Sequence, residues 1–203
     1  VLHESWDGAV SRRRACVIGH PVAQARSPVL HRHWLKEYGI DGDYTREDVL
    51  PDQINSFLKN LRTHGYVGAN ITVPHKAAAY RALDHAEPVV ETLKVTNTIW
   101  LKDDGLHGTN TDVSGFLANL DEVVPDWSID AEQAVVLGAG GGARAVVYGL
   151  LSRGLKRRFT VFSSNGKTSA SGFLRSTAAA TRPATSIQRT HDAEGHDRDG
   201  HEE

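Results

Sequence analysis

Residues 134–145 read AVVLGAGGGARA, in which an apolar run is followed directly by a glycine-rich loop. The run Ala134 to Leu137 predicts a fully buried strand, and residues 142–152 predict the helix that follows the loop. Glycines let the backbone turn sharply and approach a pyrophosphate, whose charge meets exposed N–H groups and the positive end of the helix dipole. This order of strand, loop and helix predicts a dinucleotide site, with these cofactor-binding residues: Gly138, Ala139, Gly140, Gly141 and Gly142. A glycine-rich turn without a ligand is the alternative.

The residues beyond this loop bear on the choice of cofactor. An NAD site usually has an acidic residue about 20 positions further on, which holds the ribose hydroxyls. This chain has Arg157, Arg158 and Lys167 in that stretch instead. The sequence therefore favours NADP over NAD.

Upstream of the loop, residues 15–112 alternate short β-rich runs with helical patterns, which is typical of a sheet flanked by helices. Ala15 to Gly19 reads as the first strand. Ser27 before Pro28 reads as a helix N-cap, and the helix presents one apolar face that consists of Val29, Leu30, Trp34 and Leu35. Further helices are predicted at residues 51–65, 75–93 and 114–124, and further strands at 69–73, 96–101, 106–110 and 159–162. The Asp104-Gly105 step predicts a hairpin turn.

The composition of the chain excludes some classes of binding partner. The chain has 203 residues with a formal net charge of -2, and acidic and basic residues are mixed through most of its length. No footprint for nucleic acid or a membrane surface is visible, so a small-molecule partner is expected. No apolar run approaches the roughly 20 residues of a membrane helix. Cys16 is the single cysteine, which favours a cytoplasmic location.

Three polar residues follow or adjoin predicted strands of the first unit. Lys76 comes just after Pro74 ends one strand, Asn97 adjoins the next, and Asp112 follows the hairpin. Ligands of open α/β sheets bind at the carboxyl ends of strands, so these side chains are expected to converge on one cleft. The alternatives are a solvated lysine, a turn asparagine and a helix-capping aspartate.

Five segments together resemble shikimate dehydrogenase over about residues 15–153. They are residues 19–28, 68–76, 95–99, 108–115 and the glycine loop from Gly138. The resemblance implies an α/β fold with an N-terminal substrate domain, followed by an incomplete Rossmann-like dinucleotide-binding domain. It also implies that Lys76 and Asp112 are the catalytic pair, and that the substrate-binding residues are Ser27, Thr72, Lys76, Asn97 and Asp112.

The implied activity is the reversible NADP-dependent reduction of 3-dehydroshikimate to shikimate in chorismate and aromatic amino-acid biosynthesis. Reducing a carbonyl requires a proton donor beside the hydride carrier, and Lys76 and Asp112 are residue types that suit this chemistry. The resemblance further implies a cytoplasmic monomer or homodimer without a metal. The only candidate ligands singled out, His191, His196 and His201, match no zinc-ligand spacing.

The chain also departs from the family's pattern. Ala25 stands where the first loop usually has a serine, and Lys94-Val95-Thr96 replaces a run of small and apolar residues. Beyond about residue 158 the family's Asn-Arg-Thr motif, later strands and C-terminal helix have no counterpart. A frameshift or a natural disordered tail explains the change in composition, and a truncated, inactive product that at most binds shikimate is the alternative function.

The expected domain organisation follows from these segments. Residues 1–14 form an N-terminal arm and residues 15–113 a substrate-binding catalytic domain. Residues 114–165 form an incomplete NADP-binding domain, and residues 166–203 form a disordered or out-of-frame tail.

Overall fold

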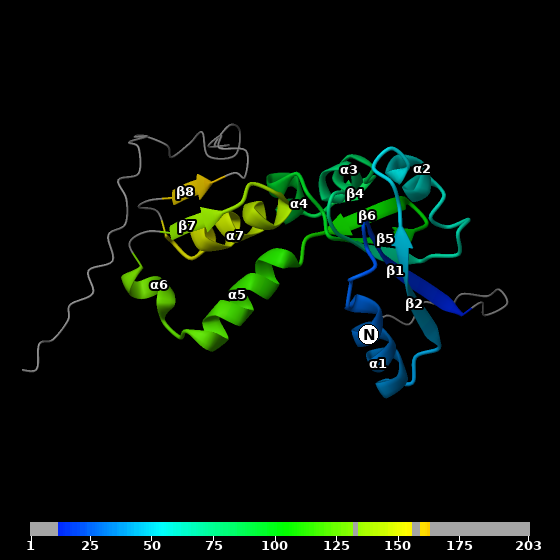
Figure 1. The fold of residues 1–203 in the computed structure, drawn as a ribbon, viewed down its shortest axis with the longest axis horizontal. Coiled ribbons are helices and arrows are strands. Elements are labelled where there is room, and N and C mark those ends of the chain that lie inside the picture. Colours follow the sequence, from blue (N-terminus) through cyan, green and yellow to red (C-terminus); the bar gives the residue numbers. More distant parts are fainter. Residues whose placement is uncertain (1–11, 132–133, 156–158, 163–203) are drawn as a thin grey trace, which may run out of the picture. The chain divides into compact units, whose positions relative to one another are not determined.

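The computed structural model describes residues 12–131, 134–155 and 159–162, which contain two sheets (Figure 1). The larger sheet has six strands in the order β2-β1-β3-β5-β6-β4. These strands are β1 (Arg13–Gly19), β2 (Gly42–Asp48), β3 (Gly68–Ile71), β4 (His85–Ala86), β5 (Thr98–Lys102) and β6 (Gly105–Thr109). Only β5 runs antiparallel to its neighbours in this sheet. The predicted α/β fold class is confirmed.

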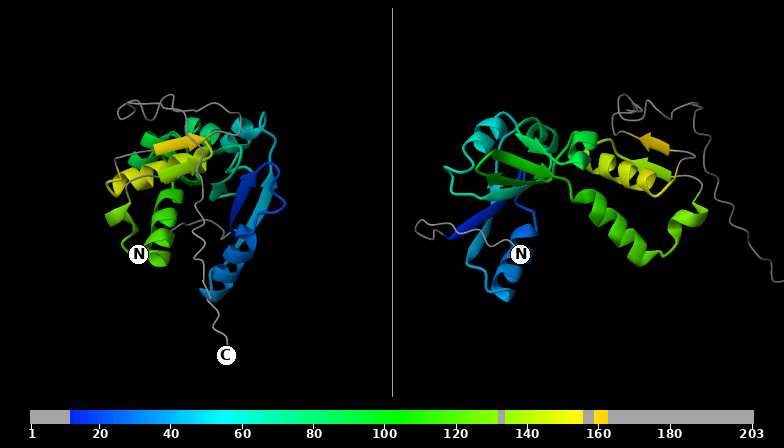
Figure 2. Two further views of the ribbon diagram at one scale, coloured as in Figure 1. Left: turned by 60° about the vertical axis from the view of Figure 1, so that its left-hand side comes forward. Right: turned by 180° about the vertical axis from the view of Figure 1, so that it is seen from behind.

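Strand β1 lies at the centre of the core, because helices cover both of its faces. Cys16 and Ile18 are buried in one cluster with side chains of α2 (Ile54–Lys59) and α3 (Lys76–Arg81). Val17 belongs to a second cluster, which includes Leu35 of α1 (Ser27–Glu37). Successive side chains of a strand point to opposite faces, so α1 and the pair α2 and α3 lie on opposite sides of the sheet (Figures 1 and 2).

Helix α1 differs from its prediction in two ways. Its N-cap is Arg26 rather than Ser27, which is the first helical residue, and Pro28 is its buried residue. The predicted apolar face is largely exposed, with Val29 61% and Leu30 52% accessible. The helix packs on the edge strand β2 and on β1, and this contact reaches only part of the helix surface. Local periodicity predicted the helix correctly but not which of its side chains are buried.

The predicted helix over residues 75–93 is interrupted in the structure. It consists of α3, the two-residue strand β4, and α4 (Pro88–Leu93). Pro88 lacks an N–H donor and disfavours helical backbone at the residue before it, and Glu87 is accordingly extended at φ -68° and ψ 156°. The helix predicted from residue 51 is also shorter, because residues 51–53 form a turn before α2.

The second α/β unit follows the first through α5 (Asp112–Val123) and α6 (Trp127–Asp130). Strand β7 (Ala134–Leu137), α7 (Gly141–Ser152) and β8 (Phe159–Phe162) come next, with β7 and β8 paired in parallel. The expectation of a fully buried β7 is wrong, because Val135 and Leu137 are exposed while Val136 is buried. Helix α7 packs on β7, and no other helix of the described residues does so to a comparable extent. No described helix combines the length and apolarity that crossing a membrane requires.

Candidate active site

The structure brings Lys76, Asn97 and Asp112 together. Lys76 Nζ donates to Asp112 Oδ2 over 2.6 Å, and Asn97 Nδ2 donates to Asp112 Oδ1 over 2.7 Å. Only 17% of the Lys76 side chain and 29% of the Asp112 side chain are exposed. Both oxygens of the carboxylate are therefore held, and the ammonium group faces a fixed negative charge.

Lys76 owes its position to the turn that links β3 to α3. His75 N donates to Thr72 O over 2.9 Å, and the buried His75 ring hydrogen-bonds through Nε2 with Val49 O over 2.7 Å. Burial lowers the pKa of His75, and its bond to the backbone opposes that shift. Thr96 N donates to Lys76 O over 3.1 Å. The first residue of α3 is thus fixed from both sides.

Asn97 connects the segment before β5 to the start of α5. Its Oδ1 accepts from Thr111 N over 2.9 Å, while its Nδ2 bonds Asp112. Asn110 is also buried and links the same two segments. Its Nδ2 donates to Val95 O over 3.2 Å, and its Oδ1 accepts from Asp112 N over 3.0 Å. Asn110 was not predicted as a site residue, although it lies inside one of the polar segments.

The geometry excludes two simpler alternatives, a solvated Lys76 and a helix cap by the Asp112 side chain. Asp112 is the first residue of α5, and the N-cap is Thr111, without a side-chain capping bond. Lys76 is ion-paired and mostly buried rather than solvated. Asn97 is buried and bonded at both ends of its amide. The catalytic and binding roles of the three residues stay predictions.

The loop before α1 is tied to β2. His20 Nδ1 and Asp48 Oδ1 lie 2.6 Å apart, and this hydrogen bond holds the pKa of the Asp48 carboxyl below its usual range. Asp48 Oδ2 accepts from Val22 N over 3.4 Å, and Arg46 Nη2 donates to Ala25 O over 2.7 Å. The backbone that leads to Ser27 is therefore restrained at several points.

A chain of hydrogen bonds that sequence reasoning missed leads from Tyr44 to Asn97. Burial raises the pKa of Tyr44, and the nearby Ser27 hydroxyl opposes the rise. Tyr44 Oη donates to Asn70 Oδ1 over 2.6 Å, and Asn70 Nδ2 donates to Thr98 Oγ1 over 3.1 Å. Thr98 Oγ1 in turn donates to Asn97 Oδ1 over 3.1 Å. Tyr44 is thus connected indirectly to the Lys76–Asp112 pair.

Thr72 follows β3 on the same edge of the sheet. Its N donates to Ile18 O over 2.9 Å, and a Cβ added to Gly19 would lie 2.5 Å from its methyl carbon. Within the described residues, no hydrogen bond joins the Thr72 side chain to Lys76, Asn97 or Asp112. A hollow of about 360 Å³ lies between α1 and the sheet, and its lining includes Asn70 and Thr98 but not the ion pair.

The glycine loop has room for a phosphate. Gly138 has φ +127°, which favours glycine, and Cβ atoms added to Gly140 or Gly142 would meet nothing within 4 Å. Helix α7 starts at Gly141 without a side-chain cap, so its first N–H groups are not taken by a capping side chain. The residues present, Ala139 included, fit a pyrophosphate. The basic residues predicted to select NADP, Arg157, Arg158 and Lys167, lie outside the described residues, as do His191, His196 and His201.

The loop lies directly beside the ion pair. A Cβ added to Gly141 would be 3.2 Å from Lys76 Cδ, and Arg144 Nη1 of α7 donates to Leu93 O over 3.1 Å. Ala145 of α7 shares a buried cluster with Leu93 and Val113. The described structure is therefore that of an α/β protein with two sheets, in which the stem of a lysine paired with an aspartate lies next to a dinucleotide-type loop.

Comparison with known proteins shows which family the chain resembles. Residues 17–99 match the family described as the shikimate dehydrogenase substrate binding domain. Over 145 residues the chain is 50% identical to the NADP(+) shikimate dehydrogenase of Azorhizobium caulinodans, covering 71% of this chain and 52% of that one. The chain is therefore related to the shikimate dehydrogenases, and the resemblance seen in the sequence is confirmed.

Solved structures agree with this relationship. Shikimate 5-dehydrogenase from Thermus thermophilus, in complex with NADP(H) and shikimate, matches with a TM-score of 0.67 and 35% identity, over 75% of this chain and 56% of that one. Quinate dehydrogenase from Corynebacterium glutamicum, in complex with NAD, matches with a TM-score of 0.65 and 30% identity, over 73% and 54%. The chain spans about half the length of these relatives.

Proposed function

We propose that this chain catalyses the reversible NADP-dependent reduction of 3-dehydroshikimate to shikimate. The observation that carries the proposal is the 2.6 Å pair of Lys76 and Asp112, with the Lys76 stem against Gly141 of the glycine loop. The relatives' names support the choice of substrate and cofactor. In this proposal residues 15–113 are the substrate-binding catalytic domain and residues 114–165 belong to the NADP-binding domain.

The chemistry assigns distinct tasks to the two members of the pair. NADPH, when bound, supplies a hydride for the carbonyl carbon of the substrate. Lys76 Nζ donates the proton that the carbonyl oxygen needs, and the resulting amine accepts it in the reverse direction. Asp112 holds Nζ in place through the 2.6 Å hydrogen bond to its Oδ2. Asn97 fixes the second oxygen of Asp112, which keeps the carboxylate from rotating away.

Substrate contacts are proposed for the residues around this pair. Ser27 would bind the substrate carboxylate, and Thr72 and Asn97 would orient the ring hydroxyls. The chain of bonds from Tyr44 through Asn70 and Thr98 supports the position of Asn97. Quinate is a competing substrate, because one structural relative is a quinate dehydrogenase.

The choice of cofactor, the partners and the cellular location are also proposals. The basic residues after β7, at positions 157, 158 and 167, support NADP over NAD, since no acidic residue stands at the ribose position. The proposed partners are small molecules, and neither nucleic acid nor a membrane. A cytoplasmic monomer or homodimer is the proposed state.

A second candidate function is shikimate binding without turnover. It is favoured by the second sheet, which has two strands in the described residues and leaves Val135 and Leu137 exposed. This candidate requires the same Ser27, Thr72 and Asn97 contacts, but no hydride transfer.

One pair of measurements separates the two candidates. The chain is mixed with shikimate and NADP, NADPH absorbance is followed, and shikimate binding is measured by calorimetry. Turnover in the ordinary range of about 1 to 1,000 per second supports the enzyme. Saturable binding without turnover supports the second candidate. Absence of both rejects shikimate as the ligand, and faster turnover of quinate reassigns the substrate.

A further inference from the structure

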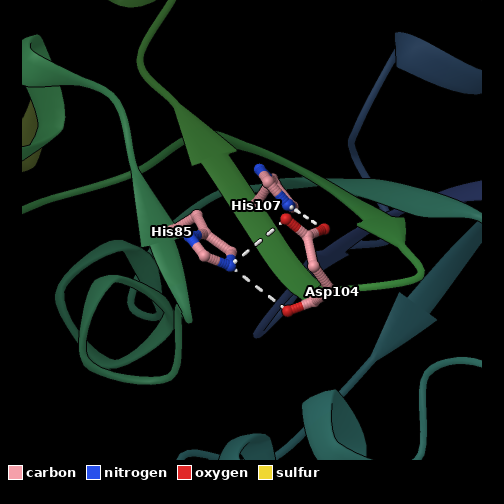
Figure 3. Close-up of side chains that lie close together, drawn as sticks. All are labelled: His85, Asp104 and His107. Atoms are coloured by element: carbon pink, nitrogen blue, oxygen red, sulfur yellow. Dashed lines mark hydrogen bonds and ion pairs between the residues drawn. The ribbon is translucent and has the colours of Figure 1, made fainter.

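Three metal-binding side chains gather at the turn of the β5–β6 hairpin. His85 lies on β4, Asp104 in the turn and His107 on β6. Figure 3 shows a nitrogen of His107 beside the Asp104 carboxylate, and a nitrogen of His85 between that carboxylate and the Asp104 backbone oxygen. Their ligand atoms all lie within 4.8 Å of one another. The Lys76–Asp112 pair adjoins the opposite end of the hairpin, where Thr98 pairs with Thr109. The cluster is therefore separate from the candidate active site.

The donor atoms lie close enough together to reach one small divalent ion after small side-chain rotations. His107 Nε2 lies 2.7 Å from Asp104 Oδ1, and His85 Nε2 lies 3.5 Å from Asp104 Oδ2. Donors around one tetrahedral zinc ion stand about 3.3 to 3.6 Å apart, because each bond to the metal is about 2.0 to 2.2 Å long. The His85 and Asp104 side chains are 49% and 60% exposed, so small rotations bring all three onto one ion.

The backbone places the two imidazoles together before an ion binds. His85 and His107 are register partners in the parallel β4–β6 pair, and their ring centroids are 4.5 Å apart. His107 also stacks on Trp100 at 5.7 Å, and only 15% of its side chain is exposed. Gly105, at φ +131°, closes the turn that carries Asp104. A preformed arrangement reduces the ordering cost of binding.

We propose that His85, Asp104 and His107 form a surface binding site for a divalent transition-metal ion, with Zn²⁺ as the ion and water as the fourth ligand. Two imidazoles and one carboxylate suit zinc, whereas calcium and magnesium prefer oxygen donors throughout. The bound ion joins the two-residue strand β4 to the hairpin and so stabilises this edge of the sheet. The spacing of these residues along the sequence did not predict the site, because His85 reaches the hairpin only through the pairing of β4 with β6.

The test is a calorimetric titration of the full chain with ZnCl₂ in a weakly coordinating buffer. One saturable equivalent is expected in the unaltered protein. His85→Gln and His107→Gln should each weaken binding by at least about tenfold, since even loss of an outer-shell partner costs about 10- to 100-fold in metal affinity. Asp104→Asn should also weaken it, while retaining a side chain that hydrogen-bonds the histidines.

Two controls separate this site from other histidines. His33→Gln alters an exposed histidine of α1 outside the cluster and should leave zinc binding unchanged. A variant with glutamine at the three C-terminal positions, His191, His196 and His201, should retain the one equivalent.

A second measurement, the melting temperature, distinguishes loss of the zinc site from misfolding of a variant. Zinc should raise the melting temperature of the unaltered chain and of His33→Gln, but not that of His107→Gln, whose circular dichroism is compared first. Zinc affinity that is unchanged in both cluster variants, or that disappears with the three C-terminal histidines, would overturn the proposal. The cluster would then be only a hydrogen-bonded support for the turn.

Discussion

Asn97 is the residue on which the candidate active site depends most. Its amide oxygen accepts from Thr111 N and its amide nitrogen donates to Asp112, so one planar group sets the start of α5 relative to β5. Asp112 then presents its other oxygen to Lys76. Lys76 and Asp112 are 36 positions apart in the sequence. The buried Asn97 side chain, bonded to Asp112, helps to hold the two in contact.

Replacing Lys76 tests its role as proton carrier. Lys76→Ala should lower kcat by about 100- to 10,000-fold, because general acid–base help is realised mainly in the transition state. Shikimate affinity should change far less. The measurement is steady-state kinetics with NADP, together with calorimetric shikimate binding.

The matched control is Thr72→Ala, which removes a neighbouring hydroxyl proposed only to orient the substrate. It should act mainly on KM, since such a bond contributes to the ground state and the transition state alike. If Lys76→Ala instead raised KM and left kcat intact, Lys76 would be a binding residue rather than the proton donor.

Tyr66 makes the free energy of unfolding depend on pH in the alkaline range. Burial and a hydrogen bond to Glu47 raise the pKa of Tyr66 to about 12, above the usual value of about 10. A raised folded pKa means that the stabilising contribution is complete below about pH 10 and is lost as pH rises towards 12. The free energy of unfolding, measured by urea titration at several pH values, should therefore fall in this window.

Tyr66→Phe is the control for this pH dependence. It should be less stable near neutral pH, because it loses bonds to Arg14 and Glu47, but its stability should fall less steeply above pH 10. Equal slopes for the two proteins would assign the alkaline loss to other groups.

At the scale of elements, the close approach of β3 and β5 determines how near the segments that carry Lys76 and Asn97 lie to each other. Gly68 pairs with Trp100, and Asn70 pairs with Thr98 just after Asn97. A Cβ added to Gly68 would lie 2.6 Å from Ile99 O and 3.2 Å from Trp100 Cα, which are backbone atoms that cannot move independently. This glycine lets the strand that leads to Lys76 lie against the strand that follows Asn97.

Gly68→Ala should therefore destabilise the fold by about 1 to 3 kcal/mol, the usual cost of forcing an extra group into a packed core. Gly115→Ala is the matched control in α5, where an added Cβ meets nothing within 4 Å. It should stabilise by about 0.4 to 1 kcal/mol through the unfolded chain's lower entropy. Denaturant unfolding of both variants checks the pair, and equal effects would contradict the packing argument.

At the scale of the whole molecule, the two sheets differ in how completely they are covered. The six-stranded sheet has helices on both faces, whereas β7 alternates between buried Val136 and exposed Val135 and Leu137. Helix α7 packs on the buried side and also against α5, where Gly149 lies close to Leu117. The two sheets share no strand pairing within the described residues, and α7 also contacts α4, which packs on β6 of the larger sheet.

Lysine substitutions test this one-sided burial. Leu137, 81% exposed, should tolerate Leu137→Lys with a change in unfolding free energy within about 0.5 kcal/mol. Val136→Lys buries an unpaired charge at a position that is 7% exposed, and should cost several kcal/mol. Thermal unfolding of the two variants is compared. Similar losses would show that Leu137 is covered in solution.

Local sequence determined several of the elements and the position of the glycine loop, but it did not predict β2, β4 or α6. Strand β1, the Asp104-Gly105 turn and the β7–loop–α7 unit were all predicted, because side-chain periodicity and the backbone limits of proline and glycine act over a few residues. The segments around Lys76, Asn97 and Asp112 were also recognisable, since each carries its polar residues within a short run.

Only the tertiary structure decided which surfaces are buried and which side chains meet. The apolar face of α1 and two residues of β7 proved exposed, because burial depends on what packs opposite, and periodicity contains no such information. The bonds from Tyr44 through Asn70 to Thr98, and the His85–Asp104–His107 cluster, join residues that are far apart in the sequence. Strand order brings them together, and that order follows from how the whole chain packs rather than from any one segment.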